Sequence, residues 1–162
     1  MPTVYVASPY GFSAATRGFY DDVLLPRLAA AGLAVADPWA DLDGVIAAAL
    51  AAADGLTDVR ERRLAFAAID ERLGAANAAM IERADLVLAI LDGVDVDSGT
   101  AAEIGYAAAL GRRVVGLRLD LRHAGDNEGV LVNLQVEHFI RRSGGVLATT
   151  LDDAVAALTA GG

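Results

Sequence analysis

The stretch "DLVLAIL" (85–91) is apolar at nearly every position. It is followed by "DGVDVDSGTAAEIGYAAALG" (92–111) and then by a second apolar run, "RVVGLRL" (113–119). A short, continuously apolar run is typical of a parallel β-strand that is covered on both faces. The alanine-rich part of the intervening stretch, residues 100–110, predicts a helix. Strand, helix and strand in this order form the unit from which parallel sheets are built, so these residues favour an α/β fold.

The rest of the chain repeats this alternation of strands and helices. Further strands are predicted at "TVYVA" (3–7), "LAVAD" (33–37) and "GGVLATT" (144–150). Helices are predicted over residues 14–31, 58–83, 130–140 and 151–159, with a short one within 41–56. Because no linker or internal repeat interrupts the pattern, we expect residues 1–162 to form a single doubly wound domain. It is of the flavodoxin-like or Rossmann-like kind, with a five-stranded parallel sheet.

The composition excludes several classes of chemistry. The chain of 162 residues contains no cysteine, and all 13 of its basic residues are arginine. Disulfides, thiolate metal sites, a cysteine nucleophile, Schiff-base chemistry and the lysine of a phosphate-binding loop are therefore ruled out. A formal net charge of -9 argues against a nucleic acid or an anionic membrane as partner. The N-terminus lacks a signal-peptide pattern and the longest apolar run (44–53) is too short to span a bilayer, so we expect a cytoplasmic protein.

The predicted fold indicates where a ligand binds. Doubly wound sheets bind ligands beyond the carboxyl ends of their strands, where the strand order reverses. The ends of the first and third strands, at Ser8 and Asp92, are expected to flank that crevice. The chain has neither GxGxxG after a predicted strand nor GxxxxGK[ST], so no dinucleotide-binding or triphosphate-binding loop is indicated. The reactive groups that remain are carboxylates, hydroxyls and amides.

Glu103 has two interpretations. The sequence "TAAE" (100–103) fits a capping box, in which the glutamate bonds back to the amide of the N-cap residue, and local sequence alone favours this structural role. The position also suits a nucleophile, because the unpaired N–H groups of a first helical turn keep a carboxylate ionised. Gly99 and Gly105 would leave room for a ligand. Asp97, on the preceding loop, is either a solvated or capping residue or an acceptor for sugar hydroxyls.

Four stretches, in the same order, resemble those of the nucleoside 2-deoxyribosyltransferase family. They are "VYVASPYGF" (4–12), "ADLVLAILDG" (84–93), "DSGTAAEIGYAAALGRRV" (97–114) and "GDNEGVLVNLQ" (125–135). The resemblance implies a double displacement at C1′ of a 2′-deoxynucleoside, through a deoxyribosyl ester of a glutamate. It also implies 2′-deoxynucleosides and free purine or pyrimidine bases as ligands, a homo-oligomer, and no need for a metal ion or cofactor.

The resemblance assigns roles to single residues. Glu103 matches the nucleophile, Tyr5 matches the phenol that holds it, and Asp97 matches the acid that binds the sugar hydroxyls. Asn133 matches an asparagine that reaches a sugar hydroxyl, in the family often in the site of a neighbouring subunit. Considered without the family, Tyr5 is also consistent with a core aromatic residue, and Asn133 with a turn.

Two aromatic residues are candidates for base recognition. Phe12 and Trp39 follow the first and second strands, and they are expected either to sandwich a base or to pack in the ordinary way. The complete set of expected substrate-binding residues is Ser8, Phe12, Trp39, Asp97, Gly99 and Asn133.

Asn77, the fourth candidate catalytic residue, departs from the family pattern. It stands where many relatives have an aspartate that exchanges a proton with the base, and an amide cannot act as an acid at neutral pH. The base preference and the proton route are therefore left open. Asp70, on the same helical face, is a substitute acid or a solvated residue.

Two other functions compete with a transferase. The first is a hydrolase of the same superfamily, which cleaves the N-glycosidic bond of a deoxynucleoside 5′-monophosphate with water as acceptor. Its candidate phosphate ligands are Ser8, Ser13 and Arg17, near a helix N-terminus that favours anions. The second is a noncatalytic nucleotide-binding module, which Asn77 favours and the intact catalytic set disfavours.

Overall fold

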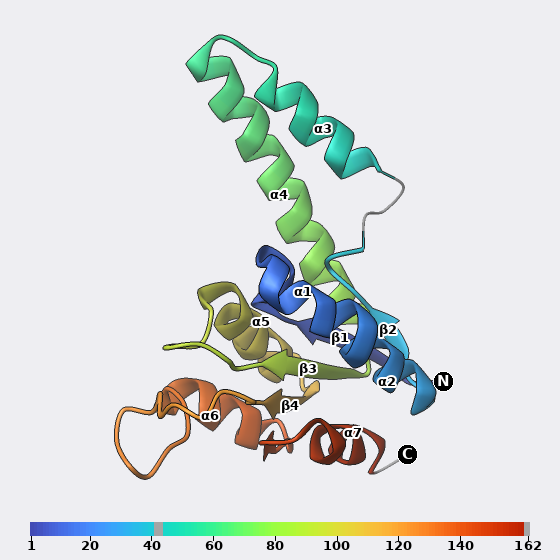
Figure 1. Cartoon of the computed structure of the whole chain (residues 1–162), viewed down its shortest axis with the longest axis vertical. Coiled ribbons are helices and arrows are strands. Elements are labelled where there is room, and N and C mark those ends of the chain that lie inside the picture. The colour runs from blue at the N-terminus through green and yellow to red at the C-terminus, as the bar shows by residue number, and fades with distance from the viewer. Residues whose placement is uncertain (41–43, 161–162) are drawn as a thin grey trace.

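A parallel sheet in the strand order β2-β1-β3-β4-β5 forms the centre of the molecule (Figure 1). In residues 1–40 and 44–160, which this computed structural model describes, the sheet has five strands. They are β1 (Thr3–Ala7), β2 (Ala34–Ala36), β3 (Leu86–Ile90), β4 (Arg113–Leu117) and β5 (Leu147–Ala148). The predicted α/β class and the five-stranded parallel sheet are confirmed, although β2 and β5 are shorter than their sequences indicated.

Helical segments connect the strands and cover both faces of the sheet (Figure 1). They are η1 (Pro9–Phe12), α1 (Ala14–Phe19), η2 (Tyr20–Leu24), α2 (Leu25–Ala30), α3 (Val45–Asp54), α4 (Val59–Arg83), α5 (Ser98–Ala109), α6 (Leu134–Arg142) and α7 (Leu151–Thr159). The helix predicted at residues 130–140 starts later, because Asn133 caps its first turn. Within the described part of the chain, no helix combines the length and the apolar character needed to cross a membrane.

The helix predicted over residues 14–31 is present but contains a wider turn, η2, between α1 and α2. The N–H of Leu25 donates to the carbonyl of Tyr20, five residues back instead of four. Pro26 follows directly, and it has no N–H to continue the regular pattern of the helix. The widened turn therefore accommodates a proline inside an otherwise continuous helical segment.

Alternate residues of each strand face opposite sides of the sheet. Val6 and Leu88 point into a core that is shared with η2, α2 and α7. Tyr5 and Val87 point into a second core, shared with α4, α5 and α6. The alternation therefore places Tyr5 on the face that α5 covers, which is the helix that carries Glu103.

β1 lies next to β3 in the centre of the sheet. From β1 the chain continues to β2, toward one edge of the sheet, and from β3 it continues to β4, toward the other edge. The register pairs Val6 with Leu88 and Ala7 with Ala89, so both strands end at the same level. This is the point where the strand order reverses, as predicted from the sequence. Of the two residues expected to flank a crevice there, Ser8 lines a cavity, whereas Asp92 does not.

The helices α3 and α4 form a hairpin that extends away from the sheet (Figure 1). Only the end of α4 that leads into β3 lies against the sheet, where Ile81 is buried. The short helix predicted within residues 41–56 is α3, and residues 41–43 lie outside the described residues. The predicted long helix from residue 58 is α4, with Asp58 as its N-cap.

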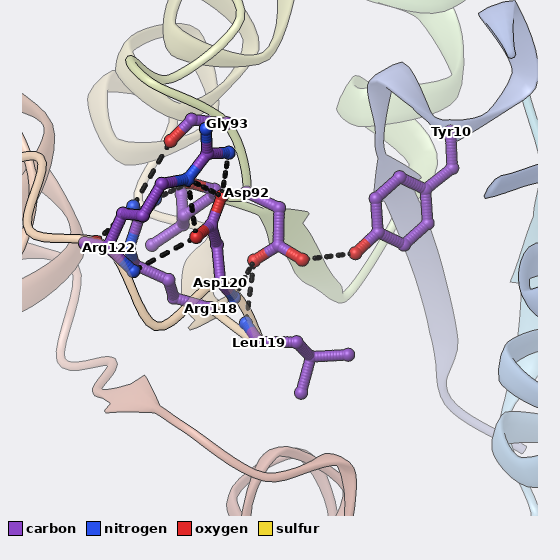
Figure 2. A network of polar contacts seen from close by, with 8 residues as sticks. Tyr10, Asp92, Gly93, Arg118, Leu119, Asp120 and Arg122 are labelled. Atoms are coloured by element: carbon purple, nitrogen blue, oxygen red, sulfur yellow. Dashed lines mark hydrogen bonds and ion pairs between the residues drawn. The ribbon is translucent and has the colours of Figure 1, made fainter. Parts of the chain in front are cut away.

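The loops that follow β3 and β4 are joined by the side chain of Arg118, directly after β4 (Figure 2). Arg118 is buried, with 2% of its surface exposed. Its guanidinium group donates hydrogen bonds to the backbone carbonyl oxygens of Leu91, of Gly93 at 3.1 Å and of Arg122 at 2.7 Å. One cationic side chain therefore binds three carbonyl groups from two loops.

Asp92 extends this contact to the loop after β1 (Figure 2). Its Oδ1 accepts hydrogen bonds from the N–H groups of Leu119 at 2.6 Å and Asp120 at 3.0 Å, and its Oδ2 accepts one from the hydroxyl of Tyr10. Burial raises the pKa of Tyr10, and the hydrogen bond to Asp92 adds to this, so the phenol remains a donor at neutral pH. The three loops that follow β1, β3 and β4, at the carboxyl ends of the strands, are thus connected by hydrogen bonds.

Replacing Arg118 with methionine is expected to destabilise the fold, because the carbonyl oxygens that it binds, including the buried one of Leu91, lose their donor. Each buried polar group left without a partner costs about 1–3 kcal/mol. We expect Arg118→Met to lower the free energy of unfolding by at least about 2 kcal/mol in urea denaturation. The control Arg72→Met, at an exposed position of α4, should change it by less than about 0.5 kcal/mol. Equal stability of the two variants would mean that Arg118 does not hold these loops.

Candidate active site

A cavity of about 520 Å³ lies at the carboxyl ends of β1, β2 and β3. Its lining residues are Ser8, Phe12, Pro38, Trp39, Ala40, Ile46, Ala47, Leu50, Leu73, Asn77, Asp97, Gly99, Thr100 and Glu103. This volume is within the range of small-molecule binding sites. The residues that the sequence assigned to catalysis or substrate binding in a transferase, except Tyr5 and Asn133, all line this cavity.

Tyr5 contacts the cavity through Glu103. The Tyr5 hydroxyl donates a hydrogen bond of 2.6 Å to Oε1 of Glu103, although the two residues are 98 positions apart in the sequence. Tyr5 is completely buried in the core, whereas Glu103 remains partly exposed. The two interpretations of Tyr5, core aromatic and partner of Glu103, therefore both describe its position.

Burial in this cavity raises the pKa of Glu103 above its ordinary value. The hydrogen bond from Tyr5 acts in the opposite direction, and the negative charge of Asp97 raises the pKa further. The pKa of Tyr5 is itself raised, first by burial and then by the charge of Glu103, so its phenol stays protonated. The pair is arranged so that a neutral donor stabilises a desolvated carboxylate.

The capping box predicted at residues 100–103 is wrong. The helix α5 begins at Ser98, and its N-cap is Asp97, whose Oδ2 accepts a hydrogen bond of 3.0 Å from the N–H of Thr100. Glu103 therefore lies in the second turn, beyond the unpaired N–H groups of the helix start, and its carboxylate turns to Tyr5 instead. The expectation that these N–H groups keep Glu103 ionised is wrong for the same reason.

The glycines of α5 do not share one role. Gly99 lines the cavity, where a Cβ atom would lie 3.1 Å from Oδ2 of Asp97. Gly105 instead faces Phe139 of α6, at 3.8 Å from the position of its Cβ, and does not contribute to the cavity lining. Only Gly99 thus leaves room for a ligand.

Phe12 and Trp39 pack against each other, and they do not form a sandwich. Their ring centroids are 4.5 Å apart and their planes are nearly perpendicular, at 87°. A base held between two rings needs parallel planes roughly 7 Å apart, since each stacking contact takes about 3.5 Å. The sandwich expected from the sequence is therefore wrong, although both rings line the same cavity.

The far wall of the cavity comes from the α3–α4 hairpin. The residues that it contributes are Ile46, Ala47 and Leu50 of α3 and Leu73 and Asn77 of α4. Asn77 is the polar member of this wall, while Asp70 is exposed and does not line the cavity. Sequence reasoning missed the apolar members, and the one available signal was the spacing of Leu73 and Asn77, which puts them on one helix face.

Asn133 lies outside the cavity. It is the N-cap of α6, and its Oδ1 accepts a hydrogen bond of 3.0 Å from the N–H of Gln135. Within this chain it thus has the role of a turn residue. Its contact with the site of a neighbouring subunit stays a prediction.

The candidate phosphate ligands are not brought together. Ser13 caps α1, and Arg17 forms an exposed ion pair of 2.7 Å with Asp21, so of the three candidates only Ser8 lines the cavity. The cavity lining, as described, includes the carboxylates of Asp97 and Glu103 and no cationic side chain. Among the described residues, no cluster of three potential ligands that could hold a metal ion is present.

Solved structures with this fold share low sequence identity with the chain. A conserved protein from Enterococcus faecalis V583 is 22% identical with a TM-score of 0.69, over 98% of this chain and 97% of that one. A 2-desoxiribosyltransferase from Leishmania mexicana is 21% identical with a TM-score of 0.65, over 98% and 97%. A CMP N-glycosidase from Clostridium botulinum is 16% identical with a TM-score of 0.56, over 96% and 97%. A search of curated proteins gave no significant match.

The family itself is decided by sequence. The family model described as nucleoside 2-deoxyribosyltransferase matches residues 4–135, from β1 to the first turn of α6. This match covers most of the chain and includes the cavity residues that follow β1, β2 and β3. The chain therefore belongs to the nucleoside 2-deoxyribosyltransferase family.

Proposed function

We propose that this protein transfers 2-deoxyribose between nucleobases, through a covalent deoxyribosyl ester of Glu103. The observation that carries this proposal is the 2.6 Å hydrogen bond from Tyr5 to Glu103 in a cavity that Asp97 also lines. A partly buried carboxylate with one oxygen held by a phenol has its other oxygen, Oε2, available for a substrate.

The proposed reaction is a double displacement at C1′ of a 2′-deoxynucleoside. Oε2 of Glu103 forms a bond to C1′ while the C1′–N bond breaks, and the electron pair of that bond leaves with the base. A nitrogen lone pair of a second base then attacks C1′, its N–H proton is released to solvent, and the ester oxygen returns to Glu103 as a carboxylate. A carboxylate suits the oxocarbenium-like character of this carbon, as in retaining glycosidases.

The other cavity residues have supporting roles in this proposal. The Asp97 carboxylate accepts a hydrogen bond from a sugar hydroxyl, at the cavity edge formed by Ser8 and Gly99. Asn77 contributes hydrogen bonds to the base but no acidic proton, because its amide does not titrate near neutral pH. The proton of the leaving base therefore comes from elsewhere, with solvent as the direct source.

The lining of the cavity favours a nucleoside over a nucleotide. Two carboxylates without a cationic neighbour in the described lining would repel a 5′-phosphate, and Arg17 is paired with Asp21 on the surface. This counts against the monophosphate hydrolase. The Tyr5–Glu103 pair counts against a noncatalytic module, because a binding site gains little from a desolvated carboxylate.

We also propose a homo-oligomer in which Asn133 reaches the site of a neighbouring copy. Asn133 belongs to the family pattern but lies outside the cavity of its own chain, where it is the half-buried N-cap of α6. A cytoplasmic location is part of the same proposal.

Glu103→Gln is expected to abolish transfer and to stabilise the protein at neutral pH. The loss of the nucleophile should lower kcat at least about a thousandfold. Because the pKa of Glu103 is raised by folding, the folded state binds more protons than the unfolded state just above the ordinary glutamate pKa. Wild-type stability therefore falls as the pH rises through this window, a loss that Gln avoids.

These two effects are measured by deoxyinosine-to-adenine transfer and by urea denaturation at several pH values. The gain in stability of Glu103→Gln should be present at pH 8 and shrink as the pH approaches about 4.3, the ordinary value for glutamate. Glu71→Gln, at an exposed position of α4, is the matched control and should change neither property. Near-normal transfer by Glu103→Gln would exclude the covalent route.

Tyr5→Phe is expected to slow the reaction without eliminating it, because the phenol orients the carboxylate and does not itself react. Removing one hydrogen bond to a charged group costs about 1.5–3 kcal/mol, or roughly 10- to 150-fold in rate. The variant also loses the contact that lowers the Glu103 pKa, so the acidic limb of its pH–rate profile should move to higher pH. Reduced stability with unchanged kinetics would limit Tyr5 to a role in the core.

2′-Deoxynucleosides are expected to react faster than ribonucleosides. Glu103 must approach C1′ closely, so a 2′-hydroxyl would crowd the carboxylate or bind it, and its electron withdrawal would also disfavour an oxocarbenium-like state. Both effects act in the same direction. We expect at least about a hundredfold difference in kcat/KM, or about 2.7 kcal/mol, between deoxyinosine and inosine. Equal rates for the two nucleosides would rule out the deoxyribosyl assignment.

A further inference from the structure

Gly11, in η1, has no side chain at the point where the indole ring of Trp39 lies against the backbone. A Cβ atom at Gly11 would lie 2.1 Å from Cδ2, 2.4 Å from Cε2 and 2.5 Å from Cε3 of Trp39. Carbon atoms in contact are normally about 3.5–4.0 Å apart, so any side chain here would displace the indole by more than about 1 Å. The φ angle of Gly11 is not positive, so the constraint comes from the indole and not from the backbone conformation.

Trp39 is also held by its two N–H groups. Its backbone N–H donates a hydrogen bond of 2.8 Å to Oδ1 of Asp37, which also accepts one of 2.6 Å from the buried hydroxyl of Tyr20. Its indole N–H donates one of 2.9 Å to the carbonyl oxygen of Ser8. Because both donors are used within the protein, the part of Trp39 that lines the cavity is a flat carbon surface.

We propose that Gly11 is a positioning residue for nucleobase binding. By leaving space for the indole, it fixes Trp39 as an apolar wall on which a planar heteroaromatic base packs, with Phe12 edge-on beside it. Gly11 does not itself line the cavity, so it acts through Trp39. The inference rests on the proposed function only in that the ligand is a nucleobase, and it does not require a covalent intermediate.

Trp39 is the only tryptophan of the chain, so tryptophan fluorescence reports directly on this wall. The probe is free adenine without a deoxyribosyl donor, which allows binding but no turnover. We compare wild type, Gly11→Ala and the matched control Gly18→Ala. Gly18 is exposed in α1, and a Cβ atom there would meet nothing within 4 Å.

Adenine is expected to change the fluorescence of wild type and Gly18→Ala with the same Kd. Gly11→Ala should bind adenine at least about tenfold more weakly, as expected when a base loses a well-placed aromatic surface. Its emission without ligand should also differ from that of wild type, because the indole has moved. In the transfer assay, the KM for adenine should rise at least about tenfold in Gly11→Ala, with a smaller change in kcat.

A second variant tests the mechanism of this effect and remains informative if Gly11→Ala does not fold. Trp39→Ala removes the ring that a Cβ atom at Gly11 would meet, so adding Gly11→Ala to it should change adenine affinity by less than about threefold in titration calorimetry. A tenfold loss in this background as well would overturn the proposal, because Gly11 would then act independently of Trp39.

The remaining outcomes separate this inference from the proposed function. Unchanged adenine binding by Gly11→Ala, or no adenine binding by wild type, would overturn the inference even if transfer occurs. Adenine binding that depends on Gly11, together with no transfer by wild type, would refute the proposed function and support the inference.

Discussion

The parallel pairing of β1 with β3 is the constraint on which the site depends. Its register runs from Val4 opposite Leu86 to Ala7 opposite Ala89, and it directs Tyr5 toward the face that α5 covers. Since side chains alternate along a strand, a shift by one residue would point the phenol to the other face and break its bond to Glu103. The same pairing sets the point where the strand order reverses, and so the place of the cavity.

The site balances two electrostatic effects on one carboxylate. Burial removes water from Glu103 and makes its ionised form more costly, which raises its pKa, and the charge of Asp97 adds to this. The hydrogen bond from Tyr5 lowers the pKa and holds one oxygen in place. A weakly solvated carboxylate held by a neutral donor fits the nucleophilic role proposed for Glu103, and the described lining has no cation to neutralise it.

Residues outside the cavity hold the residues that line it. Arg118 and Asp92 connect the loops after β1, β3 and β4, one of which leads to Asp97 (Figure 2). Gly11 leaves the space that Trp39 occupies. In both cases the contacts are formed before any ligand arrives, so little ordering of these groups is required on binding.

Local sequence determined the alternation of strands and helices, because apolar periodicity and turn residues act over a few neighbouring positions. It also contained the family motifs in their order along the chain. It did not decide which side chain caps α5, since Asp97 and "TAAE" (100–103) were both suitable. Only the tertiary structure selected Asp97, brought Tyr5 to Glu103 and set Phe12 against Trp39. These outcomes depend on contacts between distant segments, which no local pattern specifies.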